Sequence, residues 1–347
     1  VLVKADGGKL MLKATDLDLE VTETVPAEIG QAGATTVPAH ILYDIVRKLP
    51  DGAEVSLDTG DSAQLALKSG RSRFTLQILP ESDFPDLTAG DFPIRFSLPA
   101  SALKRLIDRT QFAISTEETR YYLNGIYLHV VTVPGSGSGA GDGKPMLRAV
   151  ATDGHRLAQA QVEAPAGSET MAGVIVPRKT VGEIQKLIEE PEAEVGIELS
   201  DTKIRVTLGP VVLTSKLIDG TFPDYVRVIP QGNDKILKVD KGEFASAVDR
   251  VSTVSSERGR AVKMALSDGR MVLSVNNPDS GSAIEEIGAD YAADGIEIGF
   301  NSKYLLDVAA QLETGTAEFR FADPGSPTLI TDVGETNALY VLMPMRV

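Results

Sequence analysis

The chain contains no cysteine and no tryptophan, and its only histidines are His40, His129 and His155. Without cysteine it has no disulfides, no thiolate metal sites and no cysteine nucleophile, which fits a reducing compartment. Three histidines leave little material for metal binding or acid-base catalysis. No apolar run approaches the roughly 20 residues that cross a bilayer, and no signal-peptide pattern opens the chain. We therefore expect a cytoplasmic protein with no metal and no cofactor.

Positive charge is also scarce. The sequence has 34 lysines and arginines against 49 aspartates and glutamates, which gives a formal net charge of -15. This balance repels nucleic acid on average, although the distribution of charge matters more than its sum. With 42% hydrophobic and 24% charged residues, the 347-residue chain has the composition of a globular protein and the length for two or three domains.

One structural unit recurs three times along the chain. Each copy begins with strands of period-two alternation, continues into a short amphipathic helix and ends with two or three further strands. In the first copy Leu17, Leu19 and Val21 alternate with acidic residues, while Ile41, Ile45 and Val46 lie at helical spacing. The first two copies close on "SGRSRFTLQILPESDFPDL" and "VVLTSKLIDGTFPDYVRVIP", which share the triplet FPD, and the third closes on "TLITDVGETNALYVLMPMRV".

The second and third copies carry an additional strand and helix in front, beginning at Ile94 and Ile236. The first copy has no such preface, so we expect that its opening strand and helix are missing. Each complete unit then holds two helices against about eight strands, which predicts an α+β fold with the helices on one face of an antiparallel sheet. The predicted domains are residues 1–92, which are N-terminally incomplete, 93–230 and 231–347.

The candidate catalytic and phosphate-binding motifs are weak. "ATDGHRLA" places Asp153 near His155, but no second histidine, nucleophile motif or metal-ligand spacing accompanies the pair, so a turn at a strand end explains it better than catalysis. "GSGAGDGKP" fails as a phosphate-binding loop, because Ser138 stands where glycine is needed and Pro145 where a hydroxyl should meet magnesium. We interpret the Gly/Ser-rich stretch 133–145 as a flexible hairpin loop.

The predicted helices collect positive charge that the rest of the chain lacks. For a single helix this fits a solvated face with cations near the C-terminus. Five helices in equivalent places favour a second interpretation, in which they face inward around an axis and offer DNA phosphates a positive track that is independent of base sequence. The cations are Arg47, Lys48, Lys104, Arg105, Arg109, Arg178, Lys179, Lys186, Lys241, Arg250 and Lys303.

Two strands of opposite charge suggest a further contact. They are either ordinary surface strands or the two sides of a head-to-tail interface in which two sheet edges pair. The basic strand, from "SGRSRF", carries Arg71, Arg73, Phe74 and Leu76, and the acidic one, from "NNPDSGSAIEEI", carries Asp279, Glu285 and Glu286. The final stretch, "YVLMPMRV", is more apolar than chain ends usually are, so we expect it either to complete the core or to lie beside a binding groove.

Taken together, the motifs "RYYLNG", "VATDGHRLA", "VIVPRK", "TSKLIDGTFPDYVRVIP", "VNNP", "IGFN" and "VLMPMRV" resemble, in the same order, those of the bacterial DNA sliding clamps, the beta subunits of DNA polymerase III. The resemblance covers nearly the whole chain. It implies three similar domains per protomer and a head-to-tail homodimer, closed into a ring with helices lining the hole and sheets outside. It also implies a non-enzymatic processivity factor that encircles double-stranded DNA. The implied partners are the DNA polymerase III catalytic subunit, clamp-loader subunits, and other DNA polymerases and repair proteins.

The resemblance further assigns a groove between the second and third domains that receives short peptide motifs. Adaptable methionines and aliphatic side chains suit peptides of differing sequence, and arginines at the rim suit backbone or acidic groups. The matching positions are Leu123, Thr152, Gly154, His155, Arg156 and Leu157 on one wall, Pro223, Arg227 and Val228 at the base, and Val341, Leu342, Met343, Pro344, Met345 and Arg346 closing the groove.

The same resemblance implies residues for DNA contact and dimerisation. Glu117 stands where the family has an uncharged DNA-contacting glutamine, so we expect that contact to be lost, and Thr253 replaces a larger aliphatic residue at the dimer interface. The implied DNA-facing residues are Arg47, Arg120, Tyr121, Tyr122, Arg178 and Lys179. The implied dimer contacts join Arg71, Arg73, Phe74 and Leu76 of one protomer to Thr253, Val254, Asp279, Glu285 and Glu286 of the other.

Two alternatives from other classes remain open. An enzyme could use Asp153 and His155 in a cleft, in which case substitution of His155 abolishes turnover. A monomeric module could bind partner peptides without closing into a ring, because the first unit is incomplete.

Overall fold

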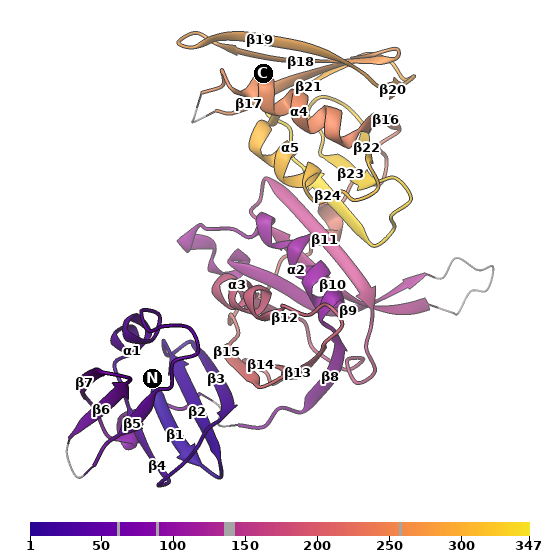
Figure 1. Cartoon of the computed structure of the whole chain (residues 1–347). Coiled ribbons are helices and arrows are strands. Elements are labelled where there is room, and N and C mark those ends of the chain that lie inside the picture. The colour runs from indigo at the N-terminus through magenta and orange to yellow at the C-terminus, as the bar shows by residue number, and fades with distance from the viewer. Residues whose placement is uncertain (61–62, 88–89, 135–142, 257–258) are drawn as a thin grey trace. The chain divides into compact units, whose positions relative to one another are not determined.

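The computed structural model describes residues 1–60, 63–87, 90–134, 143–256 and 259–347 (Figure 1). It divides into two compact units, one made of Val1–Ala100 with Lys186–Leu217 and the other of Ser101–Gln185 with Ile218–Val347. The second repeat is therefore shared between the two units. No helix in the described ranges is long and apolar enough to cross a membrane.

The order of elements confirms the predicted repeat. The first repeat contains β1 (Leu2–Asp6), β2 (Lys9–Thr15), β3 (Leu19–Pro26), β4 (Gly33–Thr36), α1 (Ala39–Val46), β5 (Ser56–Asp58), β6 (Gln64–Ser69) and β7 (Ser72–Gln77). The second contains β8 (Ile94–Pro99), α2 (Ala100–Asp108), β9 (Gly125–Pro134), β10 (Gly143–Thr152), β11 (Arg156–Glu163), β12 (Val174–Pro177), α3 (Arg178–Leu187), β13 (Glu194–Leu199), β14 (Lys203–Leu208) and β15 (Val211–Lys216).

The third repeat follows the same plan, with one additional short strand. It contains β16 (Lys235–Asp240), α4 (Lys241–Ser252), β17 (Ala261–Ser267), β18 (Arg270–Asn277), β19 (Gly281–Gly288), β20 (Asp290–Tyr291), β21 (Ile296–Asn301), α5 (Ser302–Ala309), β22 (Thr316–Phe321), β23 (Thr328–Asp332) and β24 (Ala338–Leu342). Short 3-10 helices lie at η1 (Glu81–Asp83), η2 (Gln111–Ala113), η3 (Glu118–Leu123) and η4 (Tyr225–Val228).

Two large antiparallel sheets join neighbouring repeats. The eight-stranded sheet has the order β4-β1-β2-β3-β15-β14-β13-β8, and the nine-stranded sheet has the order β12-β9-β10-β11-β24-β23-β22-β16-β20. The first repeat therefore meets the second where β3 pairs with β15, and the second meets the third where β11 pairs with β24. Two smaller sheets, β5-β6-β7 and β19-β18-β17-β21, leave β7 and β19 as edge strands.

Local sequence accounts for most of these elements. In β13 Val195, Ile197 and Leu199 are buried while the residues between them are less buried, as alternation predicts. Helix α5 begins after Asn301, whose side-chain oxygen accepts the backbone N–H of Lys303 at 2.9 Å and so satisfies one donor of the first turn. In the second repeat β9 and β10 form a hairpin, but residues 135–142 of the predicted flexible loop lie outside the described residues.

Two details of the predicted alternation are wrong. Leu17 precedes β3 and is 59% exposed, with a φ of 79° that places it in a turn. Glu20, expected to face solvent, is 1% exposed, and its carboxylate lies 3.2 Å from the Lys13 ammonium and accepts the Leu87 N–H at 3.1 Å. The ion pair and hydrogen bond let a charged residue occupy a core position.

Helix α1 forms where it was predicted, but its buried face was assigned wrongly. Ile41 and Val46 are 50% and 45% exposed. Ile45, which was predicted, and Leu42, which was not, pack against the core cluster that contains Val3. The helix is apolar on more than one face, so spacing alone did not select the face that is buried.

Candidate partner-binding site

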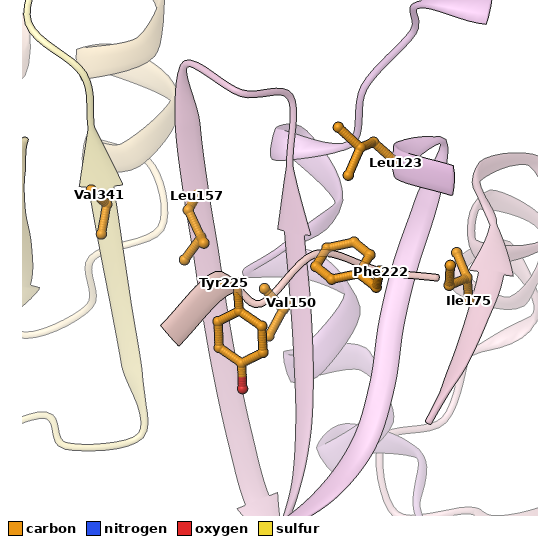
Figure 2. Packing of buried hydrophobic residues seen from close by; sticks show 7 residues of the cluster. All are labelled: Leu123, Val150, Leu157, Ile175, Phe222, Tyr225 and Val341. Atoms are coloured by element: carbon orange, nitrogen blue, oxygen red, sulfur yellow. The ribbon is translucent and has the colours of Figure 1, made fainter. Parts of the chain in front are cut away.

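A buried cluster joins the segments that carry the predicted groove residues (Figure 2). Leu123 on η3, Leu157 on β11 and Val341 on β24 are each at most 4% exposed. Burial of such aliphatic side chains stabilises a fold by about 1.5–3 kcal/mol each, so the cluster holds these distant segments together. Its remaining buried members are Val150, Ile175, Phe222 and Tyr225.

The second and third repeats meet in the middle of this cluster. Leu157 of β11 lies opposite Val341 of β24, and Arg156 lies opposite Leu342. Val341 and Leu342 are 3% and 1% exposed. These aliphatic residues therefore form the core of the junction, beneath any surface that a partner could reach.

The turn between β10 and β11 is fixed by its own side chains. Asp153 Oδ1 accepts the backbone N–H groups of His155 and Arg156 at 2.9 and 3.1 Å. The Thr152 hydroxyl accepts the Gly154 N–H at 3.1 Å and donates to the Arg156 carbonyl at 2.7 Å. Gly154 has a φ of 89°, which residues with side chains rarely adopt. The predicted strand-end turn is confirmed, and it leaves Gly154 and His155 exposed.

Arg156 is a buried structural residue of this turn. Its side chain is 8% exposed, and its Nε donates to Asp153 at 3.0 Å. Its other nitrogens donate to Asp307 of α5 and to the Phe112 carbonyl, both at 2.6 Å. The guanidinium also lies 4.2 Å from the centre of the Tyr304 ring. Because the side chain is buried and each of its three nitrogens already donates within the protein, Arg156 does not fit the rim role expected of the arginines.

Two aromatic side chains anchor the loop that carries the expected base of the groove. Phe222 stacks on Tyr127 with ring centres 4.9 Å apart, and the Tyr225 hydroxyl lies 2.9 Å from His129 Nε2 and accepts from Arg148 at 3.0 Å. Burial and the neighbouring Arg148 lower the pKa of His129 to about 4, so its imidazole is neutral at pH 7. This anchoring supports the exposed residues Pro223, Val226, Arg227 and Val228.

The last residues of the chain are held by backbone hydrogen bonds after they leave β24. The Met343 N–H donates to the His155 carbonyl at 2.9 Å, and the Met345 N–H donates to the Gly299 carbonyl of β21 at 2.8 Å. Met343 is 41% exposed, whereas Pro344 and Met345 are half-buried. Sequence analysis missed Gly299, because nothing in the motif "IGFN" indicates which distant segment it contacts.

We call the predicted groove residues the partner site, and the structure divides them by exposure. Val228 and Met343 are 51% and 41% exposed, and neighbouring Val226, which sequence analysis missed, is 53% exposed. Exposed apolar side chains are candidates for contact with a ligand, and methionine adapts to varied ligands. The buried members are Leu123, Arg156, Leu157, Val341 and Leu342; the half-buried ones are Thr152, Pro344 and Met345; the exposed ones are Gly154, His155, Pro223, Arg227, Val228, Met343 and Arg346.

The enzyme hypothesis lacks the acid-base pair that it needs. The Asp153 carboxylate is committed to backbone N–H groups and to the side chain of Arg156. Across the described ranges, no hydrogen bond or ion pair joins that carboxylate to the His155 imidazole. An acid-base assignment requires that geometry first. The turn explains why the two residues are close in sequence.

Comparison with known proteins finds relatives along the whole chain. Models of the DNA polymerase III beta subunit match residues 1–88 with its N-terminal domain, 97–224 with its central domain and 226–346 with its C-terminal domain. The chain belongs to the DNA polymerase III beta subunit family. The beta sliding clamp of Caulobacter vibrioides is 51% identical over 348 residues, which cover 100% of this chain and 91% of that protein.

More distant relatives and solved structures agree. The beta sliding clamp of Escherichia coli is 37% identical at the same coverage of both chains. A crystal structure of the DnaN sliding clamp from Bartonella birtlesii bound to griselimycin has a TM-score of 0.94 at 57% identity, and covers 100% of this chain and 91% of that one. The fold is the three-domain sliding-clamp fold, and the function is that of a DNA sliding clamp in DNA replication.

In this clamp the implied DNA-facing residues differ in how far their charge is already neutralised. Arg120 holds the Glu117 carboxylate through two hydrogen bonds of 2.8 and 3.1 Å, and Arg47 lies 2.9 Å from Asp44. The Glu117 carboxylate therefore already neutralises the charge of Arg120 within the protein. Arg178 is exposed, and none of the described residues forms an ion pair with it. Of the others, Tyr121 and Lys179 are exposed and Tyr122 is half-buried.

Two arginines of the predicted positive track already pair with acidic residues. The Arg109 side chain is 4% exposed, and its guanidinium nitrogens lie 2.7 Å from Glu313 and 3.1 Å from Glu335. Arg105 also pairs with Glu335. Helical spacing correctly placed Arg105 of α2 and Arg109, which directly follows α2, on the same side of the chain, but that side meets acidic residues of the third repeat.

The implied dimer residues lie on or beside two open edge strands, β7 and β19. Leu76 is 8% exposed and belongs to the core of the first repeat, so its side chain is largely withdrawn from the surface. Glu285 already accepts a 3.0 Å hydrogen bond from Arg250, and Glu286 lies 3.7 Å from Arg270. Among the others, Arg71, Arg73, Thr253 and Asp279 are exposed, and Phe74 and Val254 are half-buried.

Proposed function

We propose that this clamp closes as a head-to-tail homodimer around double-stranded DNA, in the cytoplasm, with helices lining the ring and sheets outside. It has no catalytic site of its own. Its partner site tethers the DNA polymerase III catalytic subunit, clamp-loader subunits, and other polymerases and repair proteins that carry clamp-binding peptides. Its domains are residues 1–92, 93–230 and 231–347.

The main support for the proposal is that equivalent strands pair at each junction between repeats. β3, β11 and β19 occupy the same place in their repeats, and so do β7, β15 and β24. Within the chain β3 pairs with β15 and β11 pairs with β24. The strands left over are β19 and β7, and both are sheet edges that need a partner. Pairing β19 of one protomer with β7 of another repeats this arrangement and produces a closed, symmetric dimer.

The partner site supports tethering through short peptides. Its exposed surface combines Val228 and Met343 with backbone that is fixed at the Gly154 turn. Such a surface can hold an extended peptide through apolar side chains without requiring one sequence. The Bartonella birtlesii clamp was crystallised with griselimycin, and we propose that this clamp binds the same compound.

Encirclement allows an acidic protein to hold DNA. A closed ring holds duplex DNA by topology, so affinity for phosphate can be modest. Exposed cations such as Arg178 supply contacts that are independent of sequence. The net charge of -15 then suppresses binding of nucleic acid elsewhere on the surface.

Sedimentation velocity tests the ring. β6 and β7 form a hairpin in which Ser69 lies opposite Ser72 and Ala66 opposite Thr75, so the Thr75 N–H points away from β6 toward the open edge. We expect the unsubstituted protein to sediment as a dimer. Thr75→Pro, which removes that N–H, should sediment as a monomer, and the control Thr75→Val should remain a dimer. A monomeric unsubstituted protein would instead support the monomeric module.

A further inference from the structure

The last residues of the chain are fixed at two points that belong to different repeats. The Met343 N–H is bonded to the His155 carbonyl of the second repeat, and the Met345 N–H is bonded to the Gly299 carbonyl of the third. Pro344 lies between them and has no N–H of its own, while its ring restricts φ. We call residues 343–347 the tail. Two anchors on alternate residues hold an extended segment whose Met343 side chain is open to solvent.

The second anchor depends on the absence of a side chain at Gly299. A Cβ at this position would lie 2.7 Å from the Met345 carbonyl oxygen, and 2.3 and 2.9 Å from the two γ-methyl carbons of Val347. Gly299 is not among the residues with positive φ, so the backbone conformation does not require glycine here. What requires glycine is the close approach of the tail to β21.

An anchored tail matters because a mobile one would have to be ordered whenever a partner bound, and the loss of backbone freedom opposes binding. With both anchors formed, Met343 is already held beside the turn that carries His155. Pre-organisation of this kind raises affinity without adding a contact to the ligand.

We propose that Gly299 is a positioning residue of the partner site: it admits the tail to the edge of β21 and thereby holds Met343 in place for partner peptides. Gly299 itself touches the tail and need not touch the peptide. This inference rests on the proposed function, because it assumes that the partner site binds peptides.

The test compares Gly299→Ala with a matched control, Gly196→Ala. Gly196 lies in the middle of β13, and a Cβ there would meet only ordinary contacts at 3.7 Å and beyond. The probe is a fluorescein-labelled peptide carrying the clamp-binding motif of the DNA polymerase III catalytic subunit. We expect Gly299→Ala to bind the peptide roughly tenfold more weakly by fluorescence anisotropy. The reason is that the backbone of about one tail residue must then be ordered when the peptide binds. Gly196→Ala should bind it normally.

A second readout follows the tail directly. The chain has seven methionines, and only Met343 and Met345 lie in the tail. In spectra of methyl-labelled methionine, Gly299→Ala should move these two signals toward those of mobile residues and leave the other five unchanged. Retention of both tail signals at their original positions would overturn the inference.

A double-mutant cycle separates an effect through the tail from general damage. If Gly299 acts by holding Met343 in place, Gly299→Ala should weaken peptide binding by a smaller factor in a Met343→Ala background than in the unsubstituted protein. An equal loss in the two backgrounds would overturn the inference. So would normal peptide binding by Gly299→Ala while the unsubstituted protein binds the probe. If the unsubstituted protein fails to bind the probe, the proposed peptide binding by the partner site is wrong, and the inference about Gly299 is wrong as well.

Discussion

Arg156 on β11 and Asp307 on α5 form an ion pair of 2.6 Å that joins the second repeat to the third beside the partner site. Removal of the Arg156 side chain, which is 8% exposed, takes a shared cation from the half-buried carboxylates of Asp153 and Asp307. Asp153 keeps its two backbone N–H donors and Asp307 keeps the Lys303 ammonium. We therefore expect Arg156→Gln to lower the free energy of unfolding by about 2 kcal/mol, as is usual when hydrogen bonds between charged groups are lost. Chemical denaturation measures this change.

Arg227 provides the control for that prediction, because it is an arginine of the same predicted site in a different environment. It pairs with Asp224 at 2.7 Å, but its side chain is 85% exposed. Arg227→Gln should change the free energy of unfolding by no more than about 0.5 kcal/mol. Equal effects of the two substitutions would contradict the structural role of Arg156.

His129 makes stability depend on pH. Burial lowers its folded pKa to about 4, below the ordinary value of 6.5, so between these values the unfolded chain binds a proton that the folded chain does not. The free energy of unfolding therefore falls as pH falls through this window, by up to about 3 kcal/mol from this one group. Relative to the unsubstituted protein, His129→Gln should lose less stability between pH 7 and pH 4.5.

His40 is the matched control for the substitution itself, because it is exposed on α1. His40→Gln should change the free energy of unfolding at pH 7 by no more than about 0.5 kcal/mol, as is usual for a surface substitution. If His129→Gln and the unsubstituted protein lost the same stability on acidification, the buried neutral imidazole would not be the source of the effect.

If Arg178 contacts DNA, its substitution should change how strongly DNA affinity depends on salt concentration. Arg178 is exposed, whereas Arg105 is already paired with Glu335. Binding of a short duplex measured at several salt concentrations should give a slope of log affinity against log salt that is shallower by about 0.9 for Arg178→Gln. Arg105→Gln should leave the slope unchanged. A shallower slope for Arg105→Gln as well would show that Arg105 of α2 also contacts DNA.

We expect deletion of residues 343–347 to remove peptide binding without changing dimerisation. These residues contact His155 and Gly299 within the protomer and lie away from β7 and β19 in sequence. The deletion should abolish binding of clamp-binding peptides and leave the sedimentation coefficient at that of the unsubstituted dimer. Normal peptide binding by the deletion variant would contradict the assignment of the tail to the partner site.

Much of the fold followed from the sequence because its signals are local. Alternation marks β13, helical spacing marks α1, and an amide side chain marks the start of α5 at Asn301. Because the unit occurs three times, each weak local pattern recurs at an equivalent position in another repeat. The alternation was misleading at Leu17, which lies in a turn, so the strand begins two residues later, at Leu19.

The features that could not be predicted depend on partners that are distant in sequence. The cations Arg109 and Arg156 have the same sequence signature as exposed ones, and only the fold brings Glu335 and Asp307 to them. Gly299 carries no signal of its own, because its role is to leave room for the tail. Family resemblance supplied the positions of the partner site, but not which of them are buried.

The central claim is that the protein holds DNA by topology, and release on linearisation tests it most directly. The clamp is loaded onto nicked circular DNA by a clamp loader with ATP, freed of unbound protein and then treated with an enzyme that cuts the circle once. The account predicts that clamps stay on the circle in high salt and leave when it is cut. Equal, salt-sensitive loss from circular and linear DNA would contradict it.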